Sequence, residues 1–502
     1  MGSKDRITST FLHKLQSHYY NIGDRGIRVD VEQIEANKKK VQSLIQTQLD
    51  IASKQWGIVV YIGADNNPGK TVDSVNLNST SGEASLLKKL QALGYHVPKI
   101  NKKNEEGEYE QKYSTGELAL QKMLTENQFN HPTGDPAIRA VLKVRELGKL
   151  QNGYLNARFC PRIIQGQKDP QFFFLSTYNV VGTVTLRRGS KRHTFGWGNN
   201  AQNFPKHSES STYVRECLIP REGNIFLMVD QIQAEEWPVS ALSQNLVALD
   251  ELKLGVDRHS RLASKVFGEY IPEKSFPDWD EAKYGLKRYL GKKIKHARNY
   301  GMRAKRMSES LAQEGFSVSV PVCTILLDKA AAVDPTVDSI FHKYIHDEIT
   351  NSRTLTGPYG WSRMFLGMRP NADNSTLFNE AYAWIPQHTV GSNTGFAVDI
   401  LESYAENSRV EGSIVQEGHD SIVQDIPCST ASILENLERT VKSFDRVIRF
   451  SNGIEIQIPI EAELGYDFKD TVSLKSFDAK GVEAALEKLE QKRAKKQSEI
   501  AA

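Results

Sequence analysis

The pattern of hydrophobic and polar positions predicts a chain that mixes helices and strands. Apolar residues recur every three or four positions in the segments that we expect to be helical, which are 31–56, 85–94, 136–155 and most of 246–345. Short apolar runs bounded by turn residues predict strands at 172–177, 180–186 and 224–230. Residues 413–427 return to mixed structure. This order, together with the length of 502 residues, predicts two to four structural units and an α+β fold.

Two short patterns near the start resemble functional motifs but have simpler explanations. Asp30 and Glu32 have the spacing of an exonuclease carboxylate pair, yet Asp30 and Gln33 also fit a capping box at the start of the helix from 31. The segment 58–71 imitates a phosphate-binding loop, but five residues rather than four separate its glycines and no helix start follows. We therefore predict a helix cap and a strand-loop-strand.

Two polar segments are expected to be exposed. The run from 101 to 112 is rich in Asn, Lys and Glu, which predicts a loop, and Ser114 to Glu117 then opens a helix with a capping box. The tail from 481 to 502 has a narrow apolar stripe, which predicts a solvated, charged helix.

Composition excludes several classes of protein. The four cysteines are far apart and form no C-x-x-C pair, so we expect a reduced, cytoplasmic protein without structural zinc. No run of about 18 apolar residues is present, and the first residues lack the apolar core of a secretory signal. We expect no membrane partner.

Positive charge is concentrated locally. Lys and Arg number 64 against 61 for Asp and Glu, which gives a net charge of only +3. Residues 283–306 nevertheless contain ten basic residues and no acidic one, and 187–192 form a second basic cluster. These two segments favour local contacts with phosphate groups.

Two aspartates are candidate ligands for divalent cations. Asp230 ends a predicted buried strand, and Asp420 precedes another apolar run. Carboxylates from separate strand ends can hold two hard cations about 3.5 to 4 Å apart, and such a pair activates a hydroxyl and stabilises the transition state of phosphoryl transfer.

A basic helix lies between these aspartates in the sequence. Arg288, Lys292, His296 and Tyr300 recur every four residues, so their side chains line one stripe of the helix. Two cations, an imidazole and a phenol in one stripe can bind a triphosphate and stack on a base or sugar.

These residues resemble three ordered motifs of the family A DNA polymerases, the bacterial DNA polymerase I type. The motifs are Asp230 with Glu235, then Arg288-x3-Lys292-x7-Tyr300, then His419-Asp420. The similarity extends over roughly 23 to 475 and includes the segments 76–79, 114–117, 182–187, 200–205, 257–268 and 385–387.

The resemblance implies a right-hand fold with a thumb, a palm built on an antiparallel sheet, and helical fingers. The expected boundaries are an N-terminal extension at 1–22, a thumb at 23–155, a palm at 156–245 and 385–480, fingers at 246–384, and the charged tail at 481–502.

The resemblance also implies roles for individual residues. Asp230, Asp420 and the backbone carbonyl of Gln231 would bind two Mg²⁺ ions, with Mn²⁺ as a substitute. Arg288 and Lys292 would bind the incoming triphosphate, and Lys292 would protonate the leaving pyrophosphate. The residues implied near the nucleotide sugar are Glu235, His296 and Tyr300, and those implied to contact the primer-template are Arg187, Asn203, Gln387 and His419.

Some positions differ from the family pattern. His296 stands where Phe or Tyr is usual, and Ser421 stands where Glu commonly follows Asp420. These differences indicate a divergent, bacteriophage-like member. Because only about 22 residues precede the thumb-like start, we also expect no intrinsic 3'-5' proofreading.

Two alternative functions remain open from the sequence. A single-subunit phage-type RNA polymerase shares the His-Asp-Ser pattern, but Glu235 disfavours a ribose 2'-hydroxyl. A non-catalytic primer-template-binding protein of the replisome would have no need for two mutually repelling aspartates. The expected partners of a monomeric enzyme are primer-template DNA, deoxynucleoside triphosphates and replisome proteins such as a helicase, a processivity factor or a separate exonuclease.

Overall fold

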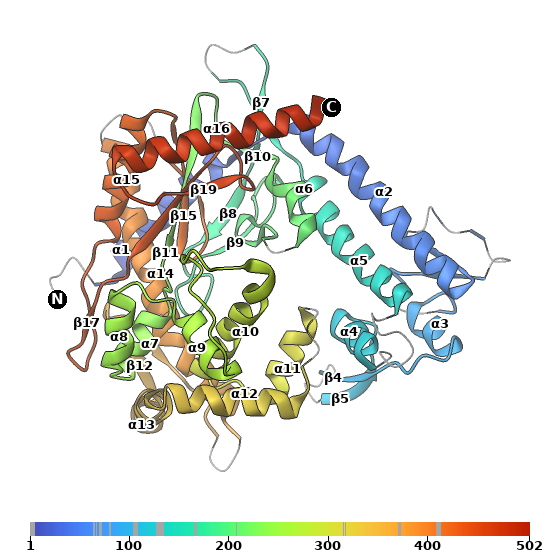
Figure 1. Ribbon diagram of the computed structural model, residues 1–502, viewed down its shortest axis with the longest axis horizontal. Helices are drawn as coiled ribbons and strands as arrows, with labels where there is room; N and C mark the ends of the chain where they lie inside the picture. Colours follow the sequence, from blue (N-terminus) through green and yellow to red (C-terminus); the bar gives the residue numbers. More distant parts are fainter. Residues whose placement is uncertain are drawn as a thin grey trace. The chain divides into compact units, whose positions relative to one another are not determined.

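The chain folds into two compact units (Figure 1). The computed structural model describes residues 6–501, apart from 64–65, 67, 70–72, 80–81, 104–108, 127–134, 165–167, 207, 315, 317, 370–372 and 408–412. The larger unit comprises Met1–Ile34, Ala157–Met302 and Ile325–Ala502. The smaller unit comprises Glu35–Asn156 and Arg303–Thr324.

A five-stranded antiparallel sheet forms the centre of the larger unit, with the strand order β14, β15, β11, β18, β19. In chain order its strands are β11 (Asn224–Gln231), β14 (Ser413–Glu417), β15 (Ser421–Pro427), β18 (Ile460–Gly465) and β19 (Thr471–Ser473). Ile225, Phe226 and Leu227 have no exposed surface. Consecutive buried residues mean that both faces of β11 are covered. The strand predicted at 224–230 is confirmed.

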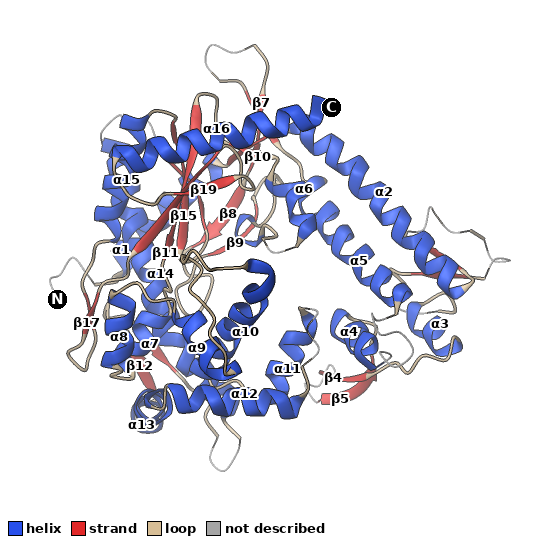
Figure 2. Cartoon of the chain, in the orientation of Figure 1, coloured by secondary structure: helices blue, strands red, loops and turns tan. Residues whose placement is uncertain are grey.

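Four helices pack against this sheet (Figure 2). Helices α1 (Ser9–Arg25) and α14 (Ser375–Asn407) contact β14. Helix α15 (Thr430–Phe444) contacts β15, and helix α16 (Ala479–Ala501) contacts β18 and β19. One apolar core includes Leu15 of α1, Val398 of α14 and Leu437 of α15. Within the described residues, no helix is long and apolar enough to cross a membrane.

The C-terminal tail is a helix, as predicted, and most of its described residues are exposed, but its narrow apolar stripe is buried. Val482, Ala485 and Leu489 recur at helical spacing and are buried in the core of the larger unit. The narrow apolar stripe is sufficient to attach α16 to the larger unit, because its three buried residues pack beside α15 and the sheet edge.

The predicted helical region from 246 to 345 is also confirmed. Its helices, with their neighbours, are α7 (Glu236–Leu242), α8 (Leu246–Lys253), α9 (Arg258–Phe267), α10 (Glu281–Asn299), α12 (Val320–Val333), the π-helix η6 (Val337–His342) and α13 (Lys343–Ser352). A buried ion network joins α7, α9 and α10, since Glu236 pairs with Arg258 and Lys295, each at 2.9 Å. Burial disfavours the ionised form of Glu236 and so raises its pKa. The charges of Lys295 and Arg258 outweigh this effect, and the pKa of the carboxyl is lowered to about 2.

Shorter elements complete the larger unit. One is a four-stranded sheet with the order β10 (Leu218–Ile219), β1 (Ile27–Val29), β7 (Gln171–Phe174), β6 (Cys160–Arg162). Three strand pairs are β8–β9 (Ser176–Asn179, Gly189–Arg192), β12–β13 (Thr354–Thr356, Ser362–Met364) and β16–β17 (Ile448–Arg449, Glu455–Ile456). The short helices are η4 (Ala201–Asn203), η5 (Glu209–Ser211) and α6 (Thr212–Arg215). The strand predicted at 180–186 is wrong. These residues form turns after β8, and Val181 and Val184 are more than half exposed.

The smaller unit is mainly helical. Its elements are α2 (Val31–Trp56), which begins in the larger unit, α3 (Leu86–Ala92), α4 (Glu117–Glu126), α5 (Pro136–Leu150), η3 (Gln151–Leu155), α11 (Ala304–Gln313), the parallel pair β2–β3 (Val59–Tyr61, Ser74–Asn76) and the antiparallel pair β4–β5 (Lys99–Lys103, Tyr109–Tyr113). The Asp30 carboxylate accepts from the Gln33 N–H at 2.9 Å, which confirms the helix cap. The loop predicted at 101–112 is wrong for 101–103 and 109–112, which pair as β4 and β5, because backbone pairing does not require apolar side chains. The rest of the predicted loop, 104–108, lies outside the described residues.

Replacement of Leu489 by Ala tests the packing of α16. Loss of this buried side chain should lower the free energy of unfolding by about 2 to 4 kcal/mol, because it leaves a cavity in the core. Urea denaturation measures the change. Lys488→Ala, on the exposed side of the same turn, is the control and should change stability by less than about 0.5 kcal/mol. Equal effects of the two substitutions would contradict the packing.

Candidate active site

Two aspartates from distant parts of the chain lie next to each other at one end of the central sheet. Asp230 on β11 is the register partner of Ser421 on β15, which Asp420 directly precedes. The backbone N–H of Gln231 donates to the carbonyl oxygen of Asp420 at 3.2 Å. Antiparallel pairing therefore brings together the two carboxylates that the sequence singled out.

The environment disfavours the charged forms of both carboxylates. Asp230 keeps exposed surface, but protein surrounds it on most sides, and the reduced hydration is the largest cause that raises its pKa to about 7. Repulsion from Asp420 adds to this shift, and repulsion from Glu461, the register partner of Asp230 on β18, adds less. Reduced hydration also raises the pKa of Asp420, although Arg187 and Lys206 oppose the change.

These residues fit a site for divalent cations with oxygen ligands. The raised pKa values mean that the neighbouring lysine and arginine do not neutralise Asp230 and Asp420 in full. No three histidine, cysteine, aspartate or glutamate side chains of the described segments gather into a metal site. A cation held by the two aspartates would therefore take its remaining ligands from backbone carbonyls, water or substrate.

The side chain of Gln231 is clamped by α14. Its amide nitrogen donates to the Thr394 hydroxyl at 2.9 Å, and its amide oxygen accepts from Asn393 at 2.8 Å. The Thr394 hydroxyl in turn donates to the carbonyl oxygen of His419 at 2.9 Å. Sequence reasoning missed Asn393 and Thr394, although consecutive polar residues in an otherwise apolar helix are a usable signal.

Glu235 is held by two partners at the start of α7. The hydroxyl of Tyr300 donates to one carboxylate oxygen of Glu235, and the guanidinium of Arg187 donates to the other. Burial and the charge of Glu235 raise the pKa of Tyr300 well above its usual value. His296 lies close by, with its Nδ1 3.8 Å from Glu235. The structure thus brings Glu235, His296 and Tyr300 together, and it adds Arg187 to them.

Helix α10 presents its predicted stripe, but most of its positive charge already has a partner. The Nε of Arg288 donates to Asp257, the N-cap of α9, at 2.5 Å. Lys295 is buried in the ion network with Glu236. Lys292 is exposed and forms no hydrogen bond or ion pair with another residue of the described ranges. Its ammonium group therefore remains available to a ligand.

His419 lies in the turn between β14 and β15, directly before Asp420. Its backbone φ is 77°, a left-handed conformation that is uncommon for residues other than glycine. Burial, together with the charges of Arg187 and Arg188, lowers the pKa of its imidazole to about 4. The imidazole is therefore neutral at pH 7.

The two other residues predicted to contact DNA are less closely connected to the aspartates. Gln387 is half-buried on α14, and no hydrogen bond of the described structure joins it to either aspartate. Asn203 is exposed in η4. Lys206, which follows η4, was missed by sequence reasoning, yet its charge lowers the pKa of both Asp230 and Asp420. No local pattern indicates it, because only the fold brings the two segments together.

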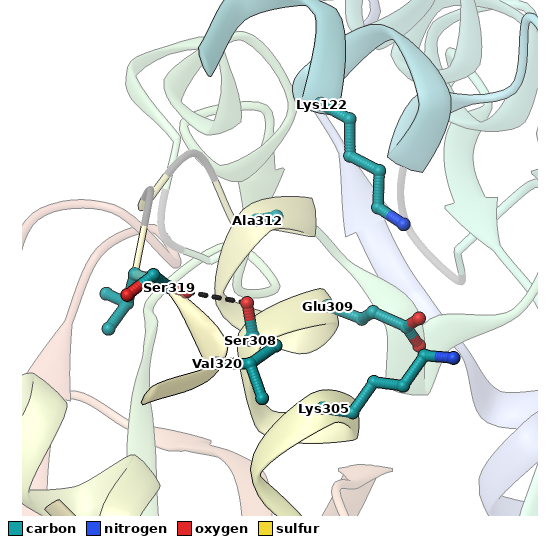
Figure 3. A pocket seen from close by; sticks show the side chains of 8 residues that line it. Lys122, Lys305, Ser308, Glu309, Ala312, Ser319 and Val320 are labelled. Carbon is teal, nitrogen blue, oxygen red and sulfur yellow. Dashed lines mark hydrogen bonds between the residues drawn. The ribbon is translucent and has the colours of Figure 1, made fainter. Parts of the chain in front are cut away.

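A cavity in the smaller unit contains none of these candidate residues. It has a volume of about 310 Å³. Figure 3 shows Lys122 from α4 on one side of it and Lys305, Ser308 and Glu309 from α11 on the other. The Ser308 hydroxyl donates to the carbonyl oxygen of Val318 at 2.6 Å. The candidate residues described above all belong to the larger unit instead.

A carboxylate pair at the end of an antiparallel sheet, with a basic helix in the same unit, is typical of enzymes that transfer nucleotidyl groups. Residues 65–469, more than half of the chain, match DNA polymerase family A. The chain belongs to this family of DNA-directed DNA polymerases, whose members use divalent metal ions. The resemblance that the sequence motifs indicated is confirmed.

Individual relatives support this membership. The DNA polymerase of Bacillus phage SP01 is 23% identical over 454 residues, which cover 86% of this chain and 44% of that protein. The thermostable DNA polymerase I of Thermus aquaticus is 30% identical over 178 residues, which cover 35% of this chain and 19% of that protein. The chain thus spans less than half the length of these curated relatives.

A solved structure shows the same fold. The POL domain of Pol1 from M. smegmatis, in complex with DNA primer-template and dNTP, matches with a TM-score of 0.67 and 18% identity, over 91% of this chain and 70% of that one. The predicted α+β polymerase fold is confirmed.

Replacement of Asp230 by Asn should stabilise the protein without metal at neutral and higher pH. The folded chain raises the pKa of Asp230 to about 7, whereas an unfolded aspartate titrates near pH 4. The folded state therefore binds the proton more tightly, and this group lowers stability as the pH rises between about 4 and 7. In EDTA, the midpoint of thermal unfolding of the wild type should fall over this range relative to Asp230→Asn.

Addition of Mg²⁺ at pH 8 should raise the midpoint of the wild type and leave that of Asp230→Asn nearly unchanged. Asp250→Asn, which removes an exposed carboxylate of α8, is the control and should follow the wild type in both comparisons. If the unfolding midpoints of the wild type and Asp230→Asn changed with pH in the same way, the destabilising effect of the Asp230 charge would be contradicted.

Proposed function

We propose that this chain extends the 3' end of a DNA primer with deoxynucleotides selected by a DNA template. The juxtaposition of Asp230 and Asp420 in a chain of family A carries the proposal. The phage relative is named a DNA polymerase, and the structural neighbour is described with DNA primer-template and dNTP. These substrates are the ones that we propose for this chain.

The cation site would be formed by the end of the central sheet. Asp230, Asp420 and the backbone carbonyl of Gln231 would hold two Mg²⁺ ions, for which Mn²⁺ can substitute, and the ions would supply positive charge where the primer hydroxyl attacks the α-phosphate. The clamp of Asn393 and Thr394 on Gln231 fixes the backbone beside Asp230. It therefore keeps the carbonyl of Gln231 in a constant position.

Helix α10 would bind the triphosphate. Arg288 and Lys292 lie one turn apart, and Lys292 is exposed. Its ammonium group would donate hydrogen bonds to the phosphates and then a proton to the leaving pyrophosphate. Binding would require Arg288 to share its guanidinium between Asp257 and the phosphates.

The group of Glu235, His296 and Tyr300 would contact the sugar of the nucleotide. Glu235 is fixed by Tyr300 and Arg187, so its carboxylate cannot turn aside without loss of both contacts. A fixed carboxylate beneath C2' would exclude a ribose 2'-hydroxyl. This position favours deoxynucleotides over ribonucleotides and argues against the RNA polymerase alternative.

The remaining assignments follow from the same proposal. Arg187, Asn203, Gln387 and His419 would contact the primer-template. The proposed units are a thumb at 23–155, a palm at 156–245 and 385–480 and fingers at 246–384, flanked by the segments 1–22 and 481–502. The central sheet, with strands at 224–231, 413–427 and 460–473, supports the palm assignment. The monomeric state, the cytoplasmic location, the replisome partners and the lack of proofreading remain predictions.

Primer extension tests the proposed activity. The wild type should add deoxynucleotides according to the template in the presence of Mg²⁺. Asp230→Ala and Asp420→Ala should abolish addition and leave primer-template binding largely intact, because neither residue is proposed to bind DNA. Extension at the wild-type rate by either variant would contradict the cation site, and the absence of extension by the wild type would contradict the proposed function.

Two neighbouring lysines test the role of α10. Lys292→Ala should lower the rate of incorporation by on the order of 10²-fold, because it removes charge stabilisation of the triphosphate. Lys293→Ala is the matched control, since it removes the same charge from the same helix but its ammonium lies over the ring of Tyr289. Single-turnover kinetics measures both. Similar losses in the two variants would show a general effect of helix charge instead.

Glu235→Ala tests the selection of the sugar. The ratio of kcat/KM for ribonucleotides to that for deoxynucleotides should rise by on the order of tenfold or more, because the carboxylate no longer occupies the space of the 2'-hydroxyl. Tyr300→Phe, which keeps the ring but loses the hydrogen bond to Glu235, should produce a smaller rise. An unchanged ratio in Glu235→Ala would contradict this role.

A further inference from the structure

Glu417 is a buried carboxyl that none of the proposed roles uses. It is the last residue of β14, three positions before Asp420, and it has no exposed surface. A buried carboxylate costs free energy unless hydrogen bonds and charges compensate. The pKa of Glu417 is raised to about 7, mainly by burial, while Arg188 and hydrogen bonds from His419 and Gln202 act in the opposite direction.

One oxygen of Glu417 holds the turn that carries Asp420. The backbone N–H of His419 donates to Oε1 of Glu417 at 2.8 Å. His419 has a φ of 77°, so its backbone conformation needs support from its surroundings. The hydroxyl of Thr394 donates to the carbonyl oxygen of the same residue. The peptide groups on both sides of His419 are therefore fixed, and Asp420 follows directly.

The other oxygen of Glu417 holds the short helix η4. The side-chain amide of Gln202 donates to Oε2 of Glu417 at 2.9 Å. The neighbouring residue on β14 makes a parallel contact, because the Gln416 amide donates to the carbonyl oxygen of Ala201 at 2.5 Å. Helix η4 carries Asn203, and Lys206 follows it. One carboxyl thus connects the Asp420 turn to the segment proposed to contact DNA.

Buried groups enclose this connection. The hydroxyl of Tyr178 accepts from the backbone N–H of Glu417 at 3.3 Å, and Tyr178 and Arg188 are both at most 2% exposed. The Arg188 guanidinium donates to the carbonyl oxygen of Gly391 on α14. A hydrogen bond in such low-dielectric surroundings is electrostatically stronger than one in water. The carboxylate therefore restricts two segments at once.

We propose that Glu417 is a positioning residue, which fixes the Asp420 turn and η4 relative to each other and so aligns the cation site with the primer-template contact. The proposal rests on the proposed function. Glu417 acts through His419 and Gln202 and does not itself touch substrate. Its loss would displace Asp420 and η4 together, whereas loss of Gln202 would release η4 alone.

Mn²⁺ binding to the full chain, measured by calorimetry without nucleotide, tests whether Glu417 positions the Asp420 turn. Glu417→Leu should raise the dissociation constant by about tenfold or more, the usual effect of removing a residue that orients a metal ligand. Glu417→Gln should stay close to the wild type, because its amide oxygen can accept from the His419 N–H and the Gln202 amide can reverse to pair with it.

Asp425→Leu is the matched control. Asp425 is a buried carboxylate of the same sheet, on β15, and pairs with Arg221 at 2.9 Å. Its loss should reduce thermal stability as Glu417→Leu does but leave Mn²⁺ affinity unchanged. Wild-type Mn²⁺ affinity in Glu417→Leu, or an equal loss in Asp425→Leu, would overturn the proposal.

Gln202→Ala tests whether Glu417 positions η4, and it does so without placing a leucine in the core. It should weaken primer-template binding, measured by fluorescence anisotropy, and preserve Mn²⁺ affinity. Unchanged primer-template affinity would overturn the proposed role of the contact between Glu417 and η4. This test remains valid even if Glu417→Leu does not fold. A wild type that binds Mn²⁺ but extends no primer would contradict the proposed function and not the role of Glu417 in the turn.

Discussion

The antiparallel pairing of β11 with β15 is the constraint on which the candidate site depends. It places Asp230 beside the residue that follows Asp420, although the two aspartates belong to distant parts of the chain. Reduced hydration raises the pKa of both carboxyls, and repulsion from Asp420 adds to the shift of Asp230, so the ionised pair opposes folding. The apolar residues of β11, which are buried on both faces, maintain the register despite the repulsion.

Polar contacts around the sheet restrict the remaining candidate residues. The side chain of Gln231 is clamped by α14, and Glu235 is fixed by Tyr300 and Arg187. A separate buried network, centred on Glu236, anchors α10 through Lys295. Lys295 makes this structural contact, whereas Lys292 of the same helix is exposed and available to a ligand. The larger unit thus combines a carboxylate pair held by the sheet with the exposed Lys292 of α10.

Features encoded locally could be predicted from the sequence. The cap at Asp30, the buried strand at 224–230 and the stripe of α10 depend on neighbours in the chain, and all three are present. Contacts between distant segments could not be predicted. Examples are the pairing of Arg288 with Asp257 and the influence of Lys206 on the aspartates. The burial of the narrow stripe of the tail and the pairing of β4 with β5 could not be predicted either, because packing and backbone pairing override weak side-chain patterns.

Asp230 and Asp420 together are proposed to form a site for divalent cations. The most direct test is a titration of Mn²⁺ into the full chain, bound to primer-template and a non-reactive deoxynucleoside triphosphate analogue, with the number of bound ions counted by electron paramagnetic resonance. The wild type should bind more ions, and bind them more tightly, than the double variant Asp230→Asn with Asp420→Asn. Equal stoichiometry and affinity in the two proteins would contradict the proposed site.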